Sequence, residues 1–187
     1  MSEEIILHYP PRGQPTRVFR PWEFRALVRA IPKNEYKDKI EALLFAGCRY
    51  AELCWLFQNP RMYKDTHIQM RNKKAMVREK YRWVKLNTQG QRAIENFLRS
   101  KKNLPTHQTW SENLERWCKY AGIDSTGVCA KSTRKTWESW LMITYQNRMI
   151  EILLSQGHGM TTALTHYLSF PFSDKDKTDM RYYVEGW

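Results

Sequence analysis

The most informative pattern of this sequence is a glycine–histidine pair followed by a tyrosine: Gly157, His158 and, nine residues after the histidine, Tyr167. Two earlier arginines, Arg49 and Arg134, stand in the short motifs Gly-Cys-Arg-Tyr-Ala-Glu-Leu and Lys-Ser-Thr-Arg. In a chain of this composition, chance gives about 0.01 such Gly-His-Tyr arrangements. Guanidinium groups are planar, permanently charged donors that match phosphate oxygens. Two arginines in one site could therefore bind a phosphate group.

In their order and separations, these residues resemble the active site of the tyrosine recombinases, the integrases that cut DNA with a tyrosine. GCRYAEL over 47–53 is similar to that family's first-arginine box, Thr-Gly-Leu-Arg-x-x-Glu-Leu, which places Glu52 in a supporting position beside Arg49. The resemblance covers most of the chain. It implies a mainly α-helical catalytic domain with a small antiparallel β-sheet (α+β), in which DNA lies across a basic face.

The resemblance also implies a role for each residue of the pattern. Arg49, Arg134 and His158 would bind the scissile phosphate, and Tyr167 would be the nucleophile. Fixed cations stabilise the charge that develops on the phosphoryl oxygens, and they favour loss of a phenol proton whose unperturbed pKa is ~10. The product would be a 3′-phosphotyrosyl link that a 5′ hydroxyl can attack. Neither a cofactor nor a metal ion is expected.

A catalytic lysine is implied in the turn of a β-hairpin. YRWVKLN, residues 81–87, is similar to the family's second hairpin strand, usually Arg-x-Val-Pro-Leu, so the candidates in the preceding turn are Lys73 and Lys74, with Lys80 behind them. Such a lysine can protonate the departing 5′ oxygen as a general acid. All three could equally belong to a solvated hairpin tip, so the choice between them stays open.

Lys131 stands where the family's second box, His-x-x-Arg, has its histidine. Lysine at this position resembles a subset of archaeal virus and plasmid integrases. An ammonium group is mostly protonated near neutral pH, so it is a poor base unless desolvation or neighbouring arginines lower its pKa. Two roles stay open for Lys131, namely proton acceptor or a cation that only binds phosphate.

Three functions fit this set of residues. The first is a site-specific DNA recombinase, most simply an integrase of a virus or plasmid. The second is a type IB topoisomerase-like relaxer, which makes the same cut but permits rotation. The third is a non-catalytic DNA-binding regulator on the same fold, against which the complete set of Arg49, Arg134, His158 and Tyr167 counts. Taken singly, each of these residues would be explained by solvation or packing, so the catalytic interpretation depends on their joint spacing.

Hydrophobic periodicity predicts the elements that must position these residues. The predicted helices run from Pro21 to Pro32, from Tyr36 to Gly47, from Arg49 to Leu56, over Ala93–Leu98, from Trp110 to Gly122, from near Lys131 through Leu141, over Ile150–Gly157, around Tyr167, and over Met180–Trp187. Two partly alternating segments, HIQM and YRWVKL, predict a β-hairpin over 66–86. The tryptophans at helical spacing, Trp110, Trp117, Trp137 and Trp140, are expected in the core.

A chain of 187 residues favours one well-packed domain. We expect a proline-rich extended arm over 1–20 and an integrase-like catalytic domain over 21–187. The arm is too short to be the separate N-terminal domain that many family members carry, so the chain would be either a minimal integrase or a catalytic fragment. The C-terminal helix could pack on its own domain or be exchanged with a neighbour.

The composition favours a polyanionic partner. Lys and Arg number 31 against 19 Asp and Glu, a formal charge of +12. A basic excess of this kind is typical of nucleic-acid binding, and membrane surfaces and acidic proteins attract it too. The family resemblance implies double-stranded DNA as the partner and self-association on DNA, as a tetramer. No apolar run approaches the ~18 residues that span a bilayer, and the first residues are acidic, unlike a signal peptide. We therefore expect an intracellular (cytoplasmic) protein with no membrane contact. Its four cysteines lack zinc-ligand spacing and are interpreted as structural.

Overall fold

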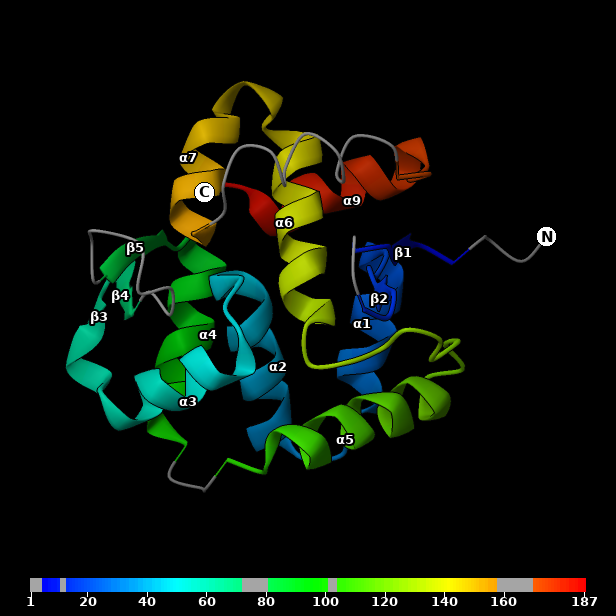
Figure 1. The fold of residues 1–187 in the computed structure, drawn as a ribbon, viewed down its shortest axis with the longest axis horizontal. Coiled ribbons are helices and arrows are strands. Elements are labelled where there is room, and N and C mark those ends of the chain that lie inside the picture. The colour runs from blue at the N-terminus through cyan, green and yellow to red at the C-terminus, as the bar shows by residue number, and fades with distance from the viewer. Residues whose placement is uncertain (1–4, 11–12, 72–80, 101–103, 158–169) are drawn as a thin grey trace.

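The computed structural model describes residues 5–10, 13–71, 81–100, 104–157 and 170–187. In these residues the chain is mainly α-helical with two small antiparallel sheets, as the sequence predicts (Figure 1). The α-helices are α1 (Pro21–Ala30), α2 (Asn34–Ala46), α3 (Tyr50–Gln58), α4 (Thr88–Arg99), α5 (His107–Tyr120), α6 (Ser132–Thr144), α7 (Met149–Gln156) and α9 (Asp174–Val184). The strands are β1 (Leu7–His8), β2 (Thr16–Arg17), β3 (Tyr63–Lys64), β4 (His67–Arg71) and β5 (Tyr81–Lys85), and two short 3-10 turns are η1 (Pro60–Met62) and η2 (Gln146–Arg148).

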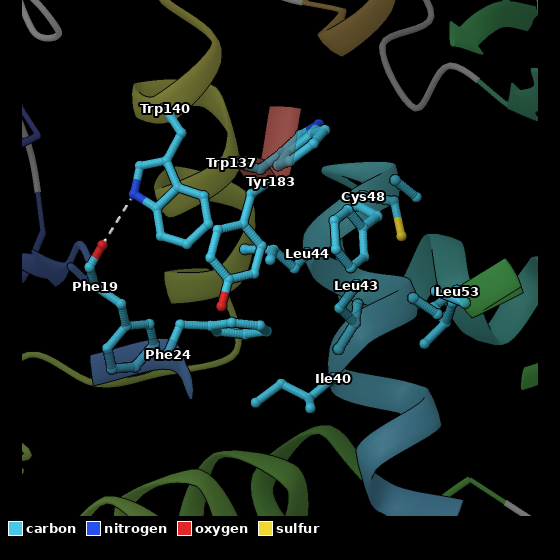
Figure 2. Packing of buried hydrophobic residues seen from close by; sticks show 14 of the residues in the cluster. Phe19, Phe24, Ile40, Leu43, Leu44, Cys48, Leu53, Trp137, Trp140 and Tyr183 are labelled. Carbon is cyan, nitrogen blue, oxygen red and sulfur yellow. Dashed lines mark hydrogen bonds between the residues drawn. The ribbon is translucent and has the colours of Figure 1, made fainter. Parts of the chain in front are cut away.

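Helices α2 and α6 form the centre of the molecule, with α4 packed against α2 and α9 passing behind α6 in the view of Figure 1. Ile40 and Leu43 of α2 and Trp137 and Trp140 of α6 are completely buried. Figure 2 shows the indole of Trp140 beside the ring of Tyr183 from α9. Trp110 and Trp117 of α5 are buried as well, so the prediction that these tryptophans belong to the core is confirmed.

Two helices end where the sequence predicts, at glycines with a left-handed backbone. Gly47 after α2 has φ 54° and Gly157 after α7 has φ 67°, a conformation that costs side-chain-bearing residues energy. The start of α4 differs from the prediction, because this helix begins at Thr88 rather than near Ala93. Asn87 is its N-cap, and its side-chain oxygen accepts a hydrogen bond of 2.9 Å from the backbone nitrogen of Gly90.

The predicted hairpin is present as the strands β4 and β5, which pair antiparallel with Ile68 opposite Val84 and Met70 opposite Arg82. The short strand β3 adds to the free edge of β4. Side chains alternate between the two faces of a strand, and Ile68, Met70 and Val84 bury one face against the helices. Arg82 shares this buried face and is only 7% exposed, which is unusual for a charged residue. Residues 72–80, which connect the two strands in the sequence, lie outside the described residues.

The described part of the predicted arm is extended and packs on the helical body. Strands β1 and β2 pair with each other, and the side chains of Ile6, Val18 and Phe19 are buried. The backbone nitrogen of Phe19 donates to Oγ1 of Thr136 at 2.9 Å, and Nε1 of Trp140 donates to the carbonyl of Phe19 at 3.1 Å (Figure 2). The division of the chain at residues 20 and 21 stays a prediction.

Helix α9 packs on α6 and α1 of its own chain. Its N-terminus is capped by Ser173, whose hydroxyl accepts a hydrogen bond from the backbone of Asp176 at 3.1 Å. The carboxylate of Asp176 in turn pairs with the buried guanidinium of Arg20, which also donates to the carbonyl of Pro171 at 3.2 Å. A buried ion pair therefore joins the segment before α1 to the start of the last helix.

Candidate active site

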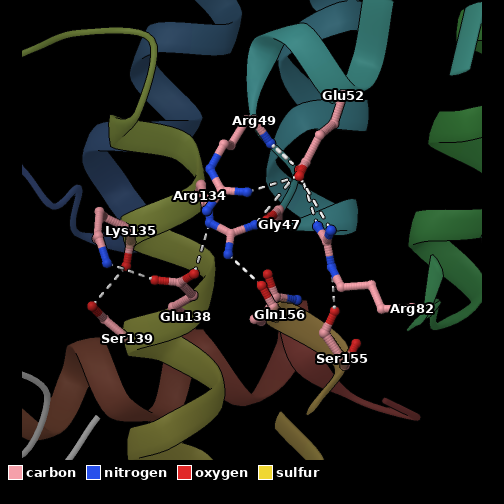
Figure 3. Close-up of polar contacts among 10 residues, drawn as sticks. All are labelled: Gly47, Arg49, Glu52, Arg82, Arg134, Lys135, Glu138, Ser139, Ser155 and Gln156. Carbon is pink, nitrogen blue, oxygen red and sulfur yellow. Dashed lines mark hydrogen bonds and ion pairs between the residues drawn. The ribbon is translucent and has the colours of Figure 1, made fainter. Parts of the chain in front are cut away.

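The carboxylate of Glu52 gathers arginines from three separate parts of the chain (Figure 3). Arg49 is the N-cap of α3, and both its backbone nitrogen and its Nη1 donate to Glu52 at 2.8 Å. Arg82 of β5 donates through Nη1 and Nη2 at 3.2 and 3.0 Å. A carboxylate at the third position of a helix that accepts the N-cap amide is half of a capping box. Glu52 thus both caps the N-terminus of α3 and binds the arginines.

Arg134, the third arginine, lies between the ends of two helices. Its Nη1 donates to the carbonyl of Gly47 at 2.7 Å, its Nη2 donates to the carbonyl of Gln156, and its Nε pairs with Glu138 at 2.9 Å. Nη1 also lies 3.8 Å from Glu52. The last carbonyls of a helix carry partial negative charge, so a buried cation is stabilised where α2 and α7 both end. Only 4% of the Arg134 side chain is exposed.

The two glycines that end α2 and α7 are required by this packing as well as by their backbone. A Cβ atom on Gly47 would lie 2.7 Å from Cδ1 of Trp137 and would also collide with the side-chain amide of Gln156. A Cβ atom on Gly157 would lie 2.9 Å from Cδ of Arg82. The absence of side chains lets the end of α2 approach Trp137 and Gln156, and the end of α7 approach Arg82.

The electrostatics keep Glu52 ionised. Burial alone would raise its pKa, but the Arg82 guanidinium, followed by Arg134 and the backbone amide of Arg49, lowers the pKa of Glu52 to about 2. The neighbouring Cys48 shows the opposite result, because burial, followed by the Glu52 charge, raises the pKa of its thiol to about 12. Cys48 is therefore a protonated core residue, in agreement with its predicted structural role.

The cluster around Glu52 has an excess of positive charge. We define the Glu52 cluster as four cations and two carboxylates: Arg49, Arg82, Arg134, Lys135, Glu52 and Glu138. Its net formal charge is +2, since four positive charges face two negative ones. The side chain of Arg49 is 42% exposed, whereas those of Arg82 and Arg134 are 6% and 4% exposed. An incoming anion would therefore meet Arg49 first.

The predicted site residues divide into three groups. Arg49 and Arg134 lie together on Glu52, and their catalytic roles stay a prediction. Lys131 lies at the start of α6, one turn before Arg134, with its side chain exposed. The remaining candidates lie outside the described residues: Lys73, Lys74, Lys80, His158 and Tyr167. Gly157, the residue just before the segment that holds His158 and Tyr167, lies beside Arg82.

Three residues of this cluster, Arg82, Lys135 and Glu138, are not among the sites that the sequence predicts. Arg82 was noticed only as part of a strand motif, although its place in the alternating pattern next to Val84 predicts that it points inward. Glu138 and Lys135 form a partly buried pair of 2.9 Å beside Arg134. Glu138 stands one helical turn after Arg134, and the i, i+4 spacing of opposite charges was the available signal.

Solved structures with the same fold are tyrosine recombinases. The Tn1549 transposon integrase (residues 82–397), solved with circular intermediate DNA, superposes with a TM-score of 0.62 at 15% identity, covering 93% of this chain and 67% of that one. The XerA recombinase gives a TM-score of 0.62 at 18% identity, covering 94% and 67%. The XerH site-specific recombinase, bound to a palindromic difH substrate in a post-cleavage complex, gives 0.56 at 16%, covering 92% and 51%.

The chain therefore has the fold of a tyrosine recombinase catalytic domain, and identities of this size show the fold alone. No family model and no curated protein sequence matches the chain. Within the described ranges, no three His, Cys, Asp or Glu side chains are grouped as metal ligands. No helix in that part of the chain combines the length and the apolar character needed to cross a bilayer.

Proposed function

We propose that this protein is a site-specific DNA recombinase that cleaves and rejoins DNA through a covalent 3′-phosphotyrosine intermediate. The observation that carries the proposal is the meeting of Arg49, from the start of α3, and Arg134, from α6, on the carboxylate of Glu52. The tyrosine recombinase fold supports the proposal. So does the sequence order of Arg49, Arg134, His158 and Tyr167.

The two arginines would bind the non-bridging oxygens of the scissile phosphate. The guanidinium of Arg134 is fixed by backbone carbonyls and Glu138, and that of Arg49 is partly exposed and held from one side by Glu52. Donors fixed before the reaction stabilise developing charge without reorganisation. A net charge of +2 in the Glu52 cluster would offset the single charge of the phosphodiester and the second charge that develops in the transition state.

In the proposed cleavage step, Oη of Tyr167 attacks phosphorus and the bond from phosphorus to the 5′ oxygen breaks. The phenol proton leaves to a base, for which Lys131 is a candidate, and the departing 5′ oxygen takes a proton from Lys73 or Lys74. His158 adds a hydrogen bond to the phosphate. In the reverse direction, a 5′ hydroxyl attacks the phosphotyrosine, so the DNA strand is rejoined without an external energy source.

The proposed partner is double-stranded DNA, on which several copies of the chain would assemble to exchange strands. Integration of a virus or plasmid is the proposed biological reaction. The formal charge of +12 fits this partner.

A trapping experiment tests the proposal. The protein is incubated with a pool of random-sequence duplexes, each nicked so that the short 5′-hydroxyl fragment diffuses away after cleavage. We expect an adduct that survives SDS, and sequencing the trapped DNA should return one preferred site. Tyr167→Phe should abolish the adduct. Tyr120→Phe, which changes an exposed tyrosine on α5, is the matched control and should leave the adduct unchanged.

Other outcomes would assign a different function. An adduct without sequence preference would favour a topoisomerase-like relaxer, and relaxation of supercoiled plasmid would verify it. Tight DNA binding without any adduct would favour a regulator. An adduct that persists in Tyr167→Phe would contradict the assignment of the nucleophile.

A further inference from the structure

Arg82 of β5 holds residues of two other elements at once (Figure 3). On one side, its Nη1 and Nη2 donate to the carboxylate of Glu52 in α3. On the other side, its Nε donates to the backbone carbonyl of Ser155, in the last turn of α7, at 3.1 Å. Only 6% of the Arg82 side chain is exposed, so the protein shields this group from a ligand at the surface. An effect of Arg82 on the reaction therefore has to act through the residues that it holds.

The last residues of α7 are attached to β5 by three contacts. The Ser155 carbonyl accepts the hydrogen bond from Arg82, and the Ser155 hydroxyl accepts one from the backbone nitrogen of Lys85 at 3.3 Å. Gly157 packs so closely on Arg82 that a Cβ atom on this glycine would lie 2.9 Å from Cδ of the arginine. The last carbonyls of a helix have no partner within the helix. The position of this helix end therefore depends on donors from β5.

The end of α7 leads directly into the segment of the proposed nucleophile. His158 follows Gly157, and Tyr167 comes nine residues after the histidine. A single peptide bond joins Gly157 to this segment, so a shift of the helix end also shifts the point where the segment starts. Attack on phosphorus requires close alignment of the reacting atoms, and a misplacement of about 1 Å costs about 10²-fold in rate. A residue that fixes the helix end can thus change the cleavage rate without contacting DNA.

We propose that Arg82 is a positioning residue for cleavage, because it fixes the end of α7, and with it the start of the 158–167 segment, relative to Glu52. This inference rests on the proposed recombinase function. Arginine suits the position because its planar group presents donors in fixed directions, two toward Glu52 and one toward Ser155. Lysine has one charged nitrogen and cannot make all three of these bonds from the same positions.

Single-turnover cleavage by Arg82→Lys tests the proposal. Excess protein is mixed with the nicked duplex that the trapping experiment recovers, and the rate of adduct formation and the dissociation constant for DNA are both measured. We expect the rate to fall by about 10²-fold and the affinity to stay within about threefold of wild type, because no phosphate contact is lost. Arg17→Lys is the matched control, since Arg17 is another buried arginine, paired with Glu23 outside the Glu52 cluster. It should leave both quantities unchanged.

Gly157→Ala tests the same contact without changing Arg82. The added methyl group meets Cδ of Arg82 at 2.9 Å, so it pushes the end of α7 away from β5. Its control is Gly122→Ala, because the two glycines have φ of 67° and 68°, but a Cβ atom on Gly122 meets no atom within 4 Å. We expect slower adduct formation in Gly157→Ala and the wild-type rate in Gly122→Ala. Since Arg82→Lys and Gly157→Ala disturb one contact, the double variant should be slowed by less than the product of the two single effects.

A substrate with sulfur in place of the bridging 5′ oxygen distinguishes an effect through α7 from an effect through the hairpin. Lys73 and Lys74, the candidate general acids, precede β5 in the sequence. When the tyrosine attacks this substrate, the phosphorus–sulfur bond breaks and its electron pair leaves on sulfur. A thiol has a pKa of about 8.5, so the thiolate leaves without a proton, and a defect in the general acid would disappear. The defect of Arg82→Lys should persist at about 10²-fold.

Several results would overturn the proposal. One is a wild-type rate in Arg82→Lys, and another is an equal loss of rate and affinity, which would make Arg82 a DNA-binding residue. Recovery of the wild-type rate on the sulfur substrate would assign Arg82 to the general acid. Equal slowing by Arg17→Lys would mean that the loss of any buried ion pair suffices.

Thermal melting followed by circular dichroism shows whether each variant is folded at the assay temperature. If Arg82→Lys is unfolded, the comparison of Gly157→Ala with Gly122→Ala decides, and equal rates in these two variants would overturn the proposal. The wild-type protein separates the two levels of the argument. Without an adduct in wild type, the recombinase function itself fails, whereas an adduct in wild type that forms equally fast in the variants contradicts only the role of Arg82.

Discussion

Arg82 donates from both of its terminal nitrogens to the two oxygens of Glu52, at 3.2 and 3.0 Å, and both side chains are almost completely buried. Two parallel bonds of this kind fix direction as well as distance. Glu52 also accepts a hydrogen bond from Arg49 and lies 3.8 Å from Arg134. The Arg82–Glu52 pair therefore links strand β5 to the two arginines that are proposed to bind phosphate. Arg82 is thus a positioning residue for Arg49 and Arg134.

We expect Glu52→Gln to destabilise the protein by about 3–5 kcal/mol, because it leaves the buried charge of Arg82 without its carboxylate and removes one of the two carboxylates beside Arg134. Urea unfolding followed by tryptophan fluorescence measures the change. Glu95→Gln is the control, since Glu95 pairs with Arg99 on the surface at 3.5 Å and its loss should cost less than about 1 kcal/mol. Equal effects of the two substitutions would contradict the central position of Glu52.

The contribution of Glu52 should depend on pH. Its pKa is about 2 in the folded protein and about 4.3 in an unfolded chain, so the folded state binds fewer protons. The stabilisation is therefore fully present above about pH 4.3 and is lost as the pH falls toward 2. We expect the difference in unfolding free energy between wild type and Glu52→Gln to be constant from pH 7 to 5 and to shrink below pH 4. A difference that grows on acidification would show that the sign is wrong.

The close approach of the α2 end to Trp137 predicts a contrast between two glycines. Gly47 and Gly122 both have positive φ, 54° and 68°, so alanine strains the backbone at either position. A Cβ atom on Gly122 meets no atom within 4 Å, whereas one on Gly47 meets Trp137 at 2.7 Å. Gly47→Ala should therefore cost about 1–3 kcal/mol more than Gly122→Ala in urea unfolding. Equal costs would mean that the packing around Gly47 relaxes freely.

The features that could be predicted from the sequence are those that particular residue types mark. Glycines marked the ends of α2 and α7, and the spacing of apolar residues predicted that the tryptophans of α5 and α6 are buried. The convergence of Arg49 and Arg134 was predicted only from the resemblance of their motifs to a known family, because no local sequence pattern indicates that two distant arginines meet. The partners of Arg134 could not be predicted in this way, since the carbonyls of Gly47 and Gln156 belong to the backbone. Every residue has such a carbonyl, and only the packing of α6 against both α2 and α7 selects these two.

The packing of the N-terminal segment could not be predicted from local sequence patterns either. Ile6, Val18 and Phe19 are buried, yet they are separated by prolines and polar residues that give no helical or strand periodicity. Their burial depends on a surface offered by α6, which includes the hydroxyl of Thr136. Tertiary contacts of this kind are not visible in a local pattern.

DNA binding should weaken steeply with salt. Each phosphate contact releases counterions from the duplex, so a protein with about six contacts loses about 10³ in affinity between 50 and 200 mM salt. Anisotropy titrations with a labelled duplex at four salt concentrations measure the slope. A slope near zero would remove duplex DNA as the partner, whatever the fold.

The last prediction concerns the most exposed cation of the Glu52 cluster. Arg49→Lys keeps the charge but loses the planar donors, so the bond to Glu52 and the proposed contact to phosphate cannot both be kept. We expect the rate of adduct formation on nicked duplexes to fall by about 10²–10³-fold, as when one transition-state donor is removed. The affinity for DNA should stay within about threefold of wild type, because only one of several phosphate contacts changes. Arg61→Lys, an exposed arginine in η1, should leave both quantities unchanged. If Arg49→Lys reduced affinity and cleavage by the same factor, Arg49 would bind the substrate and its transition state equally, and its proposed role in catalysis would be wrong.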